Sequence, residues 1–445
     1  MKKSKTVLCV VCLFVLLSSL LCGCEIGPNS IESLMRPPHV GSGQELEKAI
    51  SDLLGNAISL RSPQSGSCHT AVTLRDLNGD GQEEAVVFYS RAASSTRMCV
   101  LRQNGGKWQK VNDFAGDGNG IYCVDFDDMN GDGKSEIFVG WYLFNDKSKK
   151  TMTVYSCVEA NEQLSVKVCT SESYDCYALA DVLNNGEKQL LLAYADASKT
   201  ATTTVLKRIA LDDSGRVLTA GSVSMDSRIV RIDSLAYDQP KEGKHPRIFV
   251  DAQLSENQMI TEVFLWSNER NNFYCPFRDG KSGLNTLTQR GDTLRCADVN
   301  NDGLIEIPLR KELKQSKAGE VAMGYVLEWC SMQGEEPVPQ LYYAVNIAHD
   351  YKLFLPKDWI GKIAVHYTDA SHWSFVNNRN EELFSVTVSE TSEFDTIKES
   401  VTVLDDQSAP GMTYYCNVTK KGEAFGVTEE ILKAYFEYAS GGNVK

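Results

Sequence analysis

Three short segments of the chain place acidic and amide side chains at the same spacing. They read DLNGDGQEE from Asp76, DMNGDGKSE from Asp128 and DVNNDGLIE from Asp298. Calcium is a hard cation that takes six to eight oxygen ligands at about 2.3–2.6 Å. In this pattern the side chains at positions 1, 3, 5 and 9 and the carbonyl at position 7 can converge, because glycine at position 6 permits a tight turn. The spacing therefore predicts three calcium sites.

The predicted ligands occupy the same five positions in each segment. They are Asp76, Asn78, Asp80, the Gln82 carbonyl and Glu84; then Asp128, Asn130, Asp132, the Lys134 carbonyl and Glu136; then Asp298, Asn300, Asp302, the Leu304 carbonyl and Glu306. An EF-hand would need glutamate at position 12, where this chain has Val87, Val139 and Leu309. The alternative is a solvated Asn/Asp/Gly turn without metal, which three matching copies argue against. We expect structural calcium that fastens one strand to the next.

The segments recur at a nearly constant interval. Asp181 opens DVLNNGEKQ, a degraded copy in which we predict no tight calcium, and Asp233 lies where a further copy would fall. The steps from Asp76 through these residues to Asp298 are 52, 53, 52 and 65 residues. Each unit also carries short runs of β-prone residues, which in the first unit are 71–74, 85–89, 98–101 and 108–111. Four strands in a unit of about 50 residues are typical of a β-propeller blade.

These Asp-rich segments resemble the FG-GAP or VCBS repeat family, which occurs in integrin-like propellers and in bacterial surface proteins. The resemblance covers residues 68–346; it is specific at the three loops, weak at Asp181 and nearly absent at Asp233. It implies a mainly β fold, with a β-propeller of about five four-stranded blades. A sixth blade, completed by flanking segments, stays open as an alternative.

Segments of a different character flank the repeats. Residues 42–67 begin with a capping box at Ser42 and Glu45, followed by apolar residues at helical spacing, and predict a helix with a lead-in. Residues 347–445 contain strand-like runs and end in a helix capped by Thr428, whose first turn is acidic. We predict a small C-terminal α+β domain there.

The beginning of the chain has the features of a bacterial export signal. Three lysines precede an apolar run of fifteen residues, which is shorter than the roughly 20 residues that span a bilayer. The following Gly23–Cys24 resembles the lipobox of bacterial lipoproteins. That resemblance implies removal of residues 1–23 and acylation of Cys24 with chains such as palmitate, with 24–41 as a spacer. We expect a lipid anchor on the extracytoplasmic side of the cell membrane; an uncleaved anchor is the alternative.

Composition narrows the classes of partner. The formal charge is −14, and loss of Lys2, Lys3 and Lys5 with the leader would make it about −17. Because such a chain repels phosphate backbones, nucleic acid is excluded as the main partner. The ten cysteines from Cys68 to Cys416 form no CxxC pair and several lie in apolar runs, which favours free thiols over disulfides.

Catalytic signatures are missing from the sequence. It has no GxSxG, P-loop or strand-linked GxGxxG, and its six histidines do not occur at metal-binding spacing. The leading hypothesis is a calcium-stabilised, non-enzymatic binding or adhesion module for a protein or glycan ligand. One alternative is a carbohydrate-active or other extracytoplasmic enzyme with its site in the propeller funnel or the C-terminal domain. Another is an assembly factor whose C-terminal domain docks a partner.

Overall fold

The structure, a computed structural model, describes most of the chain after residue 41. The described residues are 42–91, 96–160, 163–196, 203–218, 221–240, 244–255, 257–291, 293–312, 324–367, 369–394 and 401–438. The expected leader, Cys24 and the spacer lie outside these residues. Within the described ranges, no helix has both the length and the apolar character needed to cross a bilayer.

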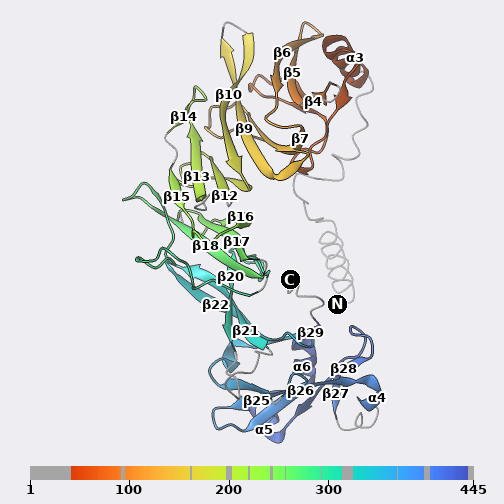
Figure 1. The fold of residues 1–445 in the computed structure, drawn as a ribbon, viewed down its shortest axis with the longest axis vertical. Helices are drawn as coiled ribbons and strands as arrows, with labels where there is room; N and C mark the ends of the chain where they lie inside the picture. The colour runs from red at the N-terminus through yellow and green to blue at the C-terminus, as the bar shows by residue number, and fades with distance from the viewer. Residues whose placement is uncertain are drawn as a thin grey trace, which may run out of the picture.

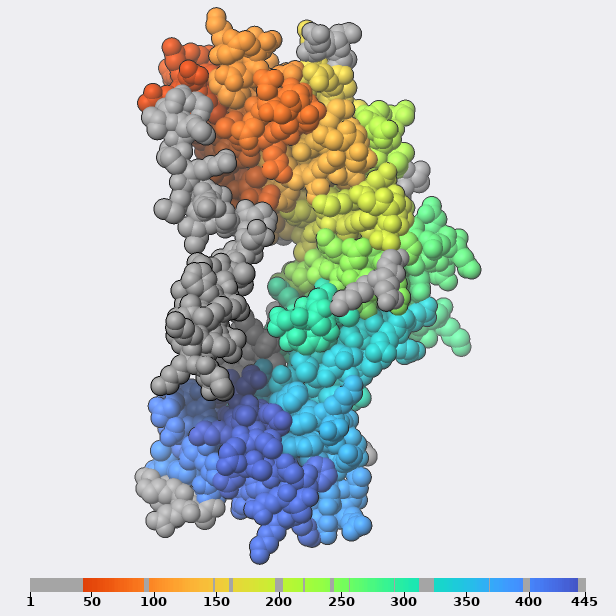
Figure 2. Space-filling view, turned by 180° about the vertical axis from the view of Figure 1, so that it is seen from behind, coloured from red at the N-terminus to blue at the C-terminus, as the bar shows by residue number. Residues whose placement is uncertain are grey.

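The described chain is mainly β, as predicted, and forms six sheets of four or five strands. Figure 1 shows the five sheets of the repeat region following one another along an open arc, with the sixth sheet beyond the fifth. The view from behind shows the same succession of packed layers (Figure 2). Because the described sheets form an arc, the closed propeller and its number of blades stay predictions.

The first three sheets each contain an antiparallel meander. The first comprises β1 (Ser59–Leu60), β3 (Val72–Arg75), β4 (Glu84–Ser90), β5 (Arg97–Asn104) and β6 (Lys107–Ala115). The second comprises β2 (Ser65–Gly66), β7 (Gly120–Asp127), β8 (Glu136–Leu143), β9 (Asp146–Ala160) and β10 (Gln163–Tyr174). The third comprises β11 (Cys176–Ala180), β12 (Gln189–Asp196), β13 (Thr203–Leu211), β14 (Val217–Leu218) and β15 (Ser222–Ser224). The four predicted strands of the first unit correspond to β3 through β6.

The next two sheets keep the same plan with one change. The fourth comprises β16 (Arg231–Asp238), β17 (Arg247–Ser255), β18 (Gln258–Ser267) and β19 (Asn272–Tyr274). The fifth comprises β20 (Glu306–Glu312), β21 (Gly324–Gln333), β22 (Glu336–Asn346), β23 (Tyr351–Phe354) and β29 (Phe436–Tyr438). In place of a regular first strand, the fifth unit has the isolated bridge between Ala297 and Glu306.

The second strand of a meander lies at the centre of the packing. Every residue of β4 is buried, which explains why its sequence is an almost unbroken apolar run rather than an alternating one. Val86 and Phe88 pack toward the second sheet, whereas Val87 and Tyr89 pack toward the helix α3 (Ser42–Leu54). Successive sheets are therefore held together by a shared core on each side, and the predicted N-terminal helix covers the free face of the first sheet.

The predicted position of the fourth unit is wrong. Asp233 lies inside β16, and the described residues between the first and second strands of this sheet are 239–240 and 244–246. The second strands begin at Glu84, Glu136, Gln189, Arg247 and Glu306, which are 52, 53, 58 and 59 residues apart. The interval is longer on both sides of the fourth unit. A constant step of 52 residues therefore places the fourth loop too early in the chain.

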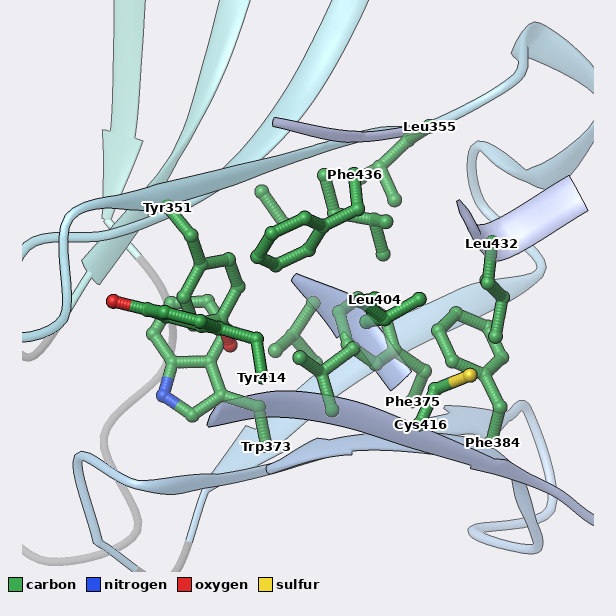
Figure 3. Packing of buried hydrophobic residues seen from close by; sticks show 14 of the residues in the cluster. Tyr351, Leu355, Trp373, Phe375, Phe384, Leu404, Tyr414, Cys416, Leu432 and Phe436 are labelled. Carbon is green, nitrogen blue, oxygen red and sulfur yellow. The ribbon is translucent and has the colours of Figure 1, made fainter. Parts of the chain in front are cut away.

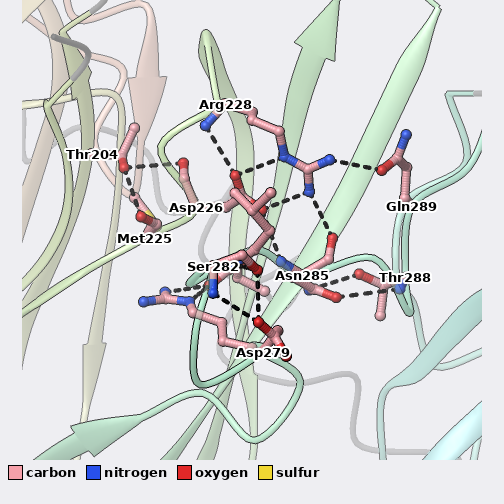
Figure 4. A network of polar contacts seen from close by, with 12 residues as sticks. Thr204, Met225, Asp226, Arg228, Asp279, Ser282, Asn285, Thr288 and Gln289 are labelled. Carbon is pink, nitrogen blue, oxygen red and sulfur yellow. Dashed lines mark hydrogen bonds and ion pairs between the residues drawn. The ribbon is translucent and has the colours of Figure 1, made fainter.

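A buried polar network holds the chain that connects the fourth sheet to the fifth (Figure 4). Asp226 is fully buried and accepts hydrogen bonds from Arg228 Nη2 at 2.7 Å and from the Asn285 backbone N–H at 2.9 Å. Arg228 also donates to the Asn285 carbonyl at 2.9 Å and to Gln289 at 2.9 Å. The network thus ties the connecting segment to the junction of the third and fourth sheets.

The C-terminal segment forms the sixth sheet and short helices. The sheet comprises β24 (Ile363–Tyr367), β25 (His372–Asn377), β26 (Glu382–Glu390), β27 (Thr402–Asp405) and β28 (Met412–Val418). The helices are η1 (Lys357–Trp359), α4 (Thr391–Phe394), α5 (Lys420–Phe425) and α6 (Glu429–Tyr435). Thr428 caps α6 as predicted, because its side chain accepts the Ile431 N–H.

An aromatic cluster fixes the sixth sheet to the fifth (Figure 3). Tyr351 of β23 packs edge-on against Trp373 of β25, with ring centroids 5.8 Å apart. Phe436 of β29 lies 5.4 Å from the ring of Tyr414 in β28. Since β23 and β29 both belong to the fifth sheet, the last segment of the chain contributes strands to two sheets, and the repeat region has no clean end at residue 346.

Candidate metal centres in the inter-strand loops

The Asp-rich segments all lead directly into the second strand of a meander. Each loop turns twice through the left-handed region, at positions 4 and 6 of the pattern. In the first two loops glycines occupy both positions, whereas Asn301 (φ 58°) and Asn184 (φ 54°) stand at position 4 in the third and the degraded loops. Asparagine tolerates this conformation better than other residues with a side chain. The replacement of glycine by asparagine at position 4 therefore preserves the backbone conformation of the loop.

The acids at positions 1 and 5 organise the loop through its own backbone. Both oxygens of Asp76 accept N–H groups, from Gly79 at 2.8 Å and from Gly81 at 2.9 Å. Asp80 accepts the Gln82 N–H at 2.8 Å. In the second, third and degraded loops, the aspartate at position 1 accepts the N–H groups of positions 5 and 6, and the side chain at position 5 accepts that of position 7. The backbone of the loop therefore holds its own acids at the turn through hydrogen bonds.

Position 9 has a role that the spacing alone did not reveal. One oxygen of Glu84 accepts the backbone N–H of Leu77, at position 2, at 3.0 Å. Glu136 and Glu306 make the same bond at 3.0 and 3.1 Å. In the degraded loop, Gln189 makes it at 2.9 Å. The side chain at position 9 therefore closes the loop from inside the sheet. In the sequence, this role is indicated by the glutamine that remains at position 9 of the degraded loop, where other predicted ligands are lost.

Burial of the position 9 glutamates is unfavourable for their charge. All three side chains are fully buried, and desolvation raises the pKa of Glu136 and of Glu306 to about 7 and also raises that of Glu84. Oε1 of Glu84 and of Glu136 has no hydrogen-bond partner among the described residues. A buried carboxylate oxygen without a partner is energetically costly unless a cation or a proton binds to it. The charge of these loops therefore favours the binding of a cation.

The predicted ligands come together only in part. Asn78 contacts Asp80 at 3.0 Å, and Asn300 contacts both Asp302, at 3.1 Å, and Glu306, at 3.3 Å. Among the described residues, however, no three histidine, cysteine, aspartate or glutamate side chains converge in a metal-binding group. The first and third loops therefore bring the side chains of positions 3 and 5 together, whereas in the second loop Asn130 donates to the Asp212 carbonyl at 2.9 Å.

The surroundings of the three loops differ in basic side chains. Arg102 of β5 lies 2.8 Å from Asp80 and 3.8 Å from Glu84. In the second loop Lys134 lies 3.3 Å from Asp132, but no ion pair within the described ranges involves Glu136. In the described surroundings of the third loop, its acids have no ion pair with lysine or arginine. The need for an added cation is therefore smallest in the first loop.

Neighbouring loops touch across the sheets. The Ser135 N–H of the second loop donates to the Leu77 carbonyl of the first at 3.0 Å. A Cβ on Gly79 would lie 2.5 Å from the Gly133 carbonyl oxygen, so this approach requires glycine at position 4. Lys188, at position 8 of the degraded loop, pairs with Asp127, which precedes the second loop, at 2.7 Å. The loops thus form part of the junctions between successive sheets.

The fourth unit reverses the charge at position 9. Arg247 begins β17, is only 7% exposed, and pairs with Asp238 through contacts of 2.7 Å and 2.5 Å. It also donates to the Met332 carbonyl of the fifth sheet at 2.6 Å. Asp238 in turn accepts the Ile305 N–H of the third loop at 2.8 Å. This unit neutralises its buried charge internally and still bridges to its neighbour.

A cavity of about 970 Å³ opens beside the third loop, between the fourth and fifth sheets. Its walls include Trp266 and Tyr274, and its exposed rim includes Lys244, Asp302 and Gln333. Tyr274 donates its hydroxyl to Glu335, which also lines the cavity, at 2.7 Å. The cavity therefore combines aromatic walls with hydrogen-bonding groups of both charges.

Comparisons with known proteins agree with the repeat assignment. The family model described as FG-GAP-like repeat matches residues 76–139, and curated protein sequences contain no match to the chain. Among solved structures, a Lactobacillus plantarum protein is similar over 72% of this chain and 81% of its own, at 10% identity and a TM-score of 0.27. Saccharomyces cerevisiae Sqt1 is similar over 75% and 84%, at 10% identity and a TM-score of 0.30.

TM-scores this low do not establish a shared fold with either protein. The match to the family model includes the first two Asp-rich loops together with β4 through β7. It confirms the family resemblance that those loops indicated. Residues 76–139 of this chain are an FG-GAP-like repeat.

Proposed function

We propose that the protein is a lipid-anchored extracytoplasmic binding module whose propeller-like row of sheets is stiffened by calcium. The observation that carries this proposal is the acidic loop with a buried glutamate at position 9, which recurs in the first, second and fifth units. Calcium would add charge balance at the junctions, with Asp128, Asp132 and Glu136 as the acids of the second loop. The chain's own residues already supply the turn, the oxygens and the contact with the next sheet.

Calorimetric melting with and without a chelator tests the calcium part of the proposal. At a free calcium concentration 100-fold above the dissociation constant, each site would stabilise the fold by about 2.7 kcal/mol. The melting temperature should therefore rise by several degrees with calcium and respond little to magnesium, which prefers a tighter, octahedral site. Equal melting temperatures in calcium and in chelator would contradict a structural calcium.

The cavity between the fourth and fifth sheets is the proposed ligand site, and a glycan is the ligand class that its chemistry favours. Sugar rings have an apolar face that packs on aromatic walls such as Trp266 and Tyr274, and a hydroxyl edge that needs both donors and acceptors. Lys244, Gln333 and Asp302 at the rim offer both. A strongly charged ligand would meet like charge on one side of this rim.

Calorimetric titration with neutral tetrasaccharides of glucose and of N-acetylglucosamine tests the glycan proposal. We expect binding to the native chain and at least a tenfold loss in Lys244→Ala combined with Gln333→Ala. Both changes are at exposed positions, so folding should be unaffected, and Lys357→Ala serves as an exposed control outside the cavity. Failure of both sugars to bind the native chain, or equal sugar affinity in the native chain and the double variant, would contradict this site.

The anchor requires its own test. Expression in a bacterium fed labelled palmitate should label the native chain and leave Cys24→Ser unlabelled. Release of native, full-length chain from the membrane by high salt would contradict covalent lipid attachment, because acyl chains are held by burial rather than by charge.

A further inference from the structure

We propose that the first Asp-rich loop carries its own cation, the Arg102 guanidinium, so that the protein holds two calcium ions, in the second and third loops. The inference rests on the proposed calcium function of the loops. It departs from the three equivalent sites that the sequence pattern alone predicts. The position of this one side chain distinguishes the first loop from the other two.

The guanidinium of Arg102 lies among three carboxylates. Nη2 is 2.8 Å from Asp80 Oδ2, Nε is 3.8 Å from Glu84 Oε1, and Nη1 is 3.2 Å from Glu159 Oε1. Asp80 and Glu84 are positions 5 and 9 of the loop pattern, and Glu159 belongs to β9 of the second sheet. One cation therefore already contacts two of the three acids that a calcium ion would need.

The charge of this side chain is permanent. Arginine keeps its proton under all conditions in which proteins fold, and its planar fork of donors suits several carboxylates at once. The Arg102 side chain is 23% exposed and Glu84 is fully buried, so solvent screens the contact with Glu84 only weakly. A divalent ion bound by Asp80 and Glu84 would have to displace the guanidinium or share these oxygens with it.

The other loops lack an equivalent residue. Oε1 of Glu84 and of Glu136 alike lacks a hydrogen-bond partner in the described chain, but Glu84 has Arg102 at 3.8 Å, whereas Glu136 forms no ion pair with a described residue. Lys134 is the basic residue of that loop, but it contacts Asp132 and not the buried glutamate. For the third loop, the ion pairs found among the described residues include none with Asp298, Asp302 or Glu306. These two loops leave a buried negative charge for an external cation.

The fourth unit gives an internal precedent for a guanidinium in this place. Arg247 stands at position 9 itself and pairs with the buried Asp238. In both units an arginine balances the buried acid of the junction and also reaches the next sheet, through Glu159 for Arg102 and through the Met332 carbonyl for Arg247. The chain therefore uses two chemical solutions, an arginine or an open acidic loop, for the same junction.

Counting the bound calcium tests the inference directly. Full-length protein, lipid-anchored or as the signal-free body, is equilibrated with calcium, freed of excess ion and analysed for metal by mass spectrometry. We expect two ions per native chain and three per Arg102→Gln chain, because glutamine removes the charge but keeps a polar side chain of similar reach. Arg102→Lys, which keeps the charge, should hold two.

Arg97→Gln is the matched control. Arg97 lies on the same strand and forms an ion pair of 2.8 Å with Asp113, away from the Asp-rich loop, and its loss should leave two ions. Three ions in the native chain, or two in a folded Arg102→Gln chain, would overturn the inference while leaving calcium in the loops intact. A native chain without any calcium would instead overturn the proposed function, so the two failures are distinguishable.

Discussion

The second and fourth units place opposite charges at the same point of the same backbone plan. Glu136 and Arg247 each begin the second strand of a meander, and each is buried at the junction with a neighbouring sheet. Arg247 has a bidentate acidic partner, whereas Glu136 keeps an oxygen without one. The comparison shows that the plan tolerates either charge, provided that something balances it. In the fourth unit the chain supplies that balance, and in the second unit we propose that calcium does.

The largest expected effect comes from breaking the internal pair of the fourth unit. Arg247→Gln would leave Asp238 buried without its cation, and such a loss costs about 3–5 kcal/mol of unfolding free energy. Urea denaturation with the two-state fit measures it. The control is Lys207→Gln, since Lys207 pairs with Glu172 at 2.6 Å while both side chains stay about a third exposed (37% and 32%). That change should cost less than about 1 kcal/mol; equal costs would show that the buried pair is not special.

A smaller effect is expected from neutralising position 9 of the second unit. Glu136→Gln keeps the acceptor for the Met129 N–H, as Gln189 does for Val182 in the third unit. The fold should therefore survive and the calcium-free form should gain stability, because a buried charge is gone. Calcium affinity of that loop should fall at least tenfold, which is about 1.4 kcal/mol, as measured by calorimetric titration. Unchanged affinity would remove Glu136 from the ligand set.

The calcium-free protein should show a distinctive pH dependence. Glu136 and Glu306 have a folded pKa of about 7, raised from 4.5 by burial, so between these values the folded state binds more protons than the unfolded state. Stability in chelator should consequently be greatest near pH 4.5 as far as these groups are concerned, and fall as pH rises to about 7. The Glu136→Gln, Glu306→Gln double variant should lose most of that slope. A native profile that rises through the same window would contradict the raised pKa values.

The smallest effect concerns the thiols. Burial raises the pKa of Cys99, Cys157, Cys330 and Cys416 to about 12, and the ten cysteines in the described chain are unpaired. Because the thiolate is the reactive form, these four should resist iodoacetamide at pH 8 in the folded protein and react in urea. Peptide mass spectrometry resolves each site. Rapid labelling of the four under native conditions would show that the sheets open more easily than their packing indicates.

Much of the repeat architecture could be predicted from the sequence, because it depends on residues that are close together in the chain. The pattern at Asp76 fixes a turn, and the apolar runs on either side fix the strands, so the loops and the first-unit meander were found. A constant interval predicts the fourth loop at Asp233, which instead lies inside β16. The start of the fourth unit's second strand is marked instead by Arg247 before the apolar run 248–250, which a search for acidic loops passes over.

Features that depend on contacts between distant segments could not be predicted in the same way. Arg102 lies 18 residues after Glu84 and 57 residues before Glu159, and only the packing of the first sheet on the second brings the three together. Likewise, Tyr351 and Phe436 reach one aromatic cluster because β23 and β29 pair. Phe436 and Tyr438 are β-prone residues, but three residues directly after a helix are too few to predict a strand. Their structure follows from the sheet that they join.

Anomalous diffraction from crystals grown in calcium and soaked in a lanthanide tests the central claim most directly, because it locates each ion. The account predicts peaks inside the loops 128–136 and 298–306, with oxygens of Asp128, Asp132, Asp298 and Asp302 within bonding distance. It predicts no peak at Arg247 in the fourth unit. Peaks confined to the surface, with both loops bare, would contradict the claim that the buried acids of these junctions are balanced by a metal ion.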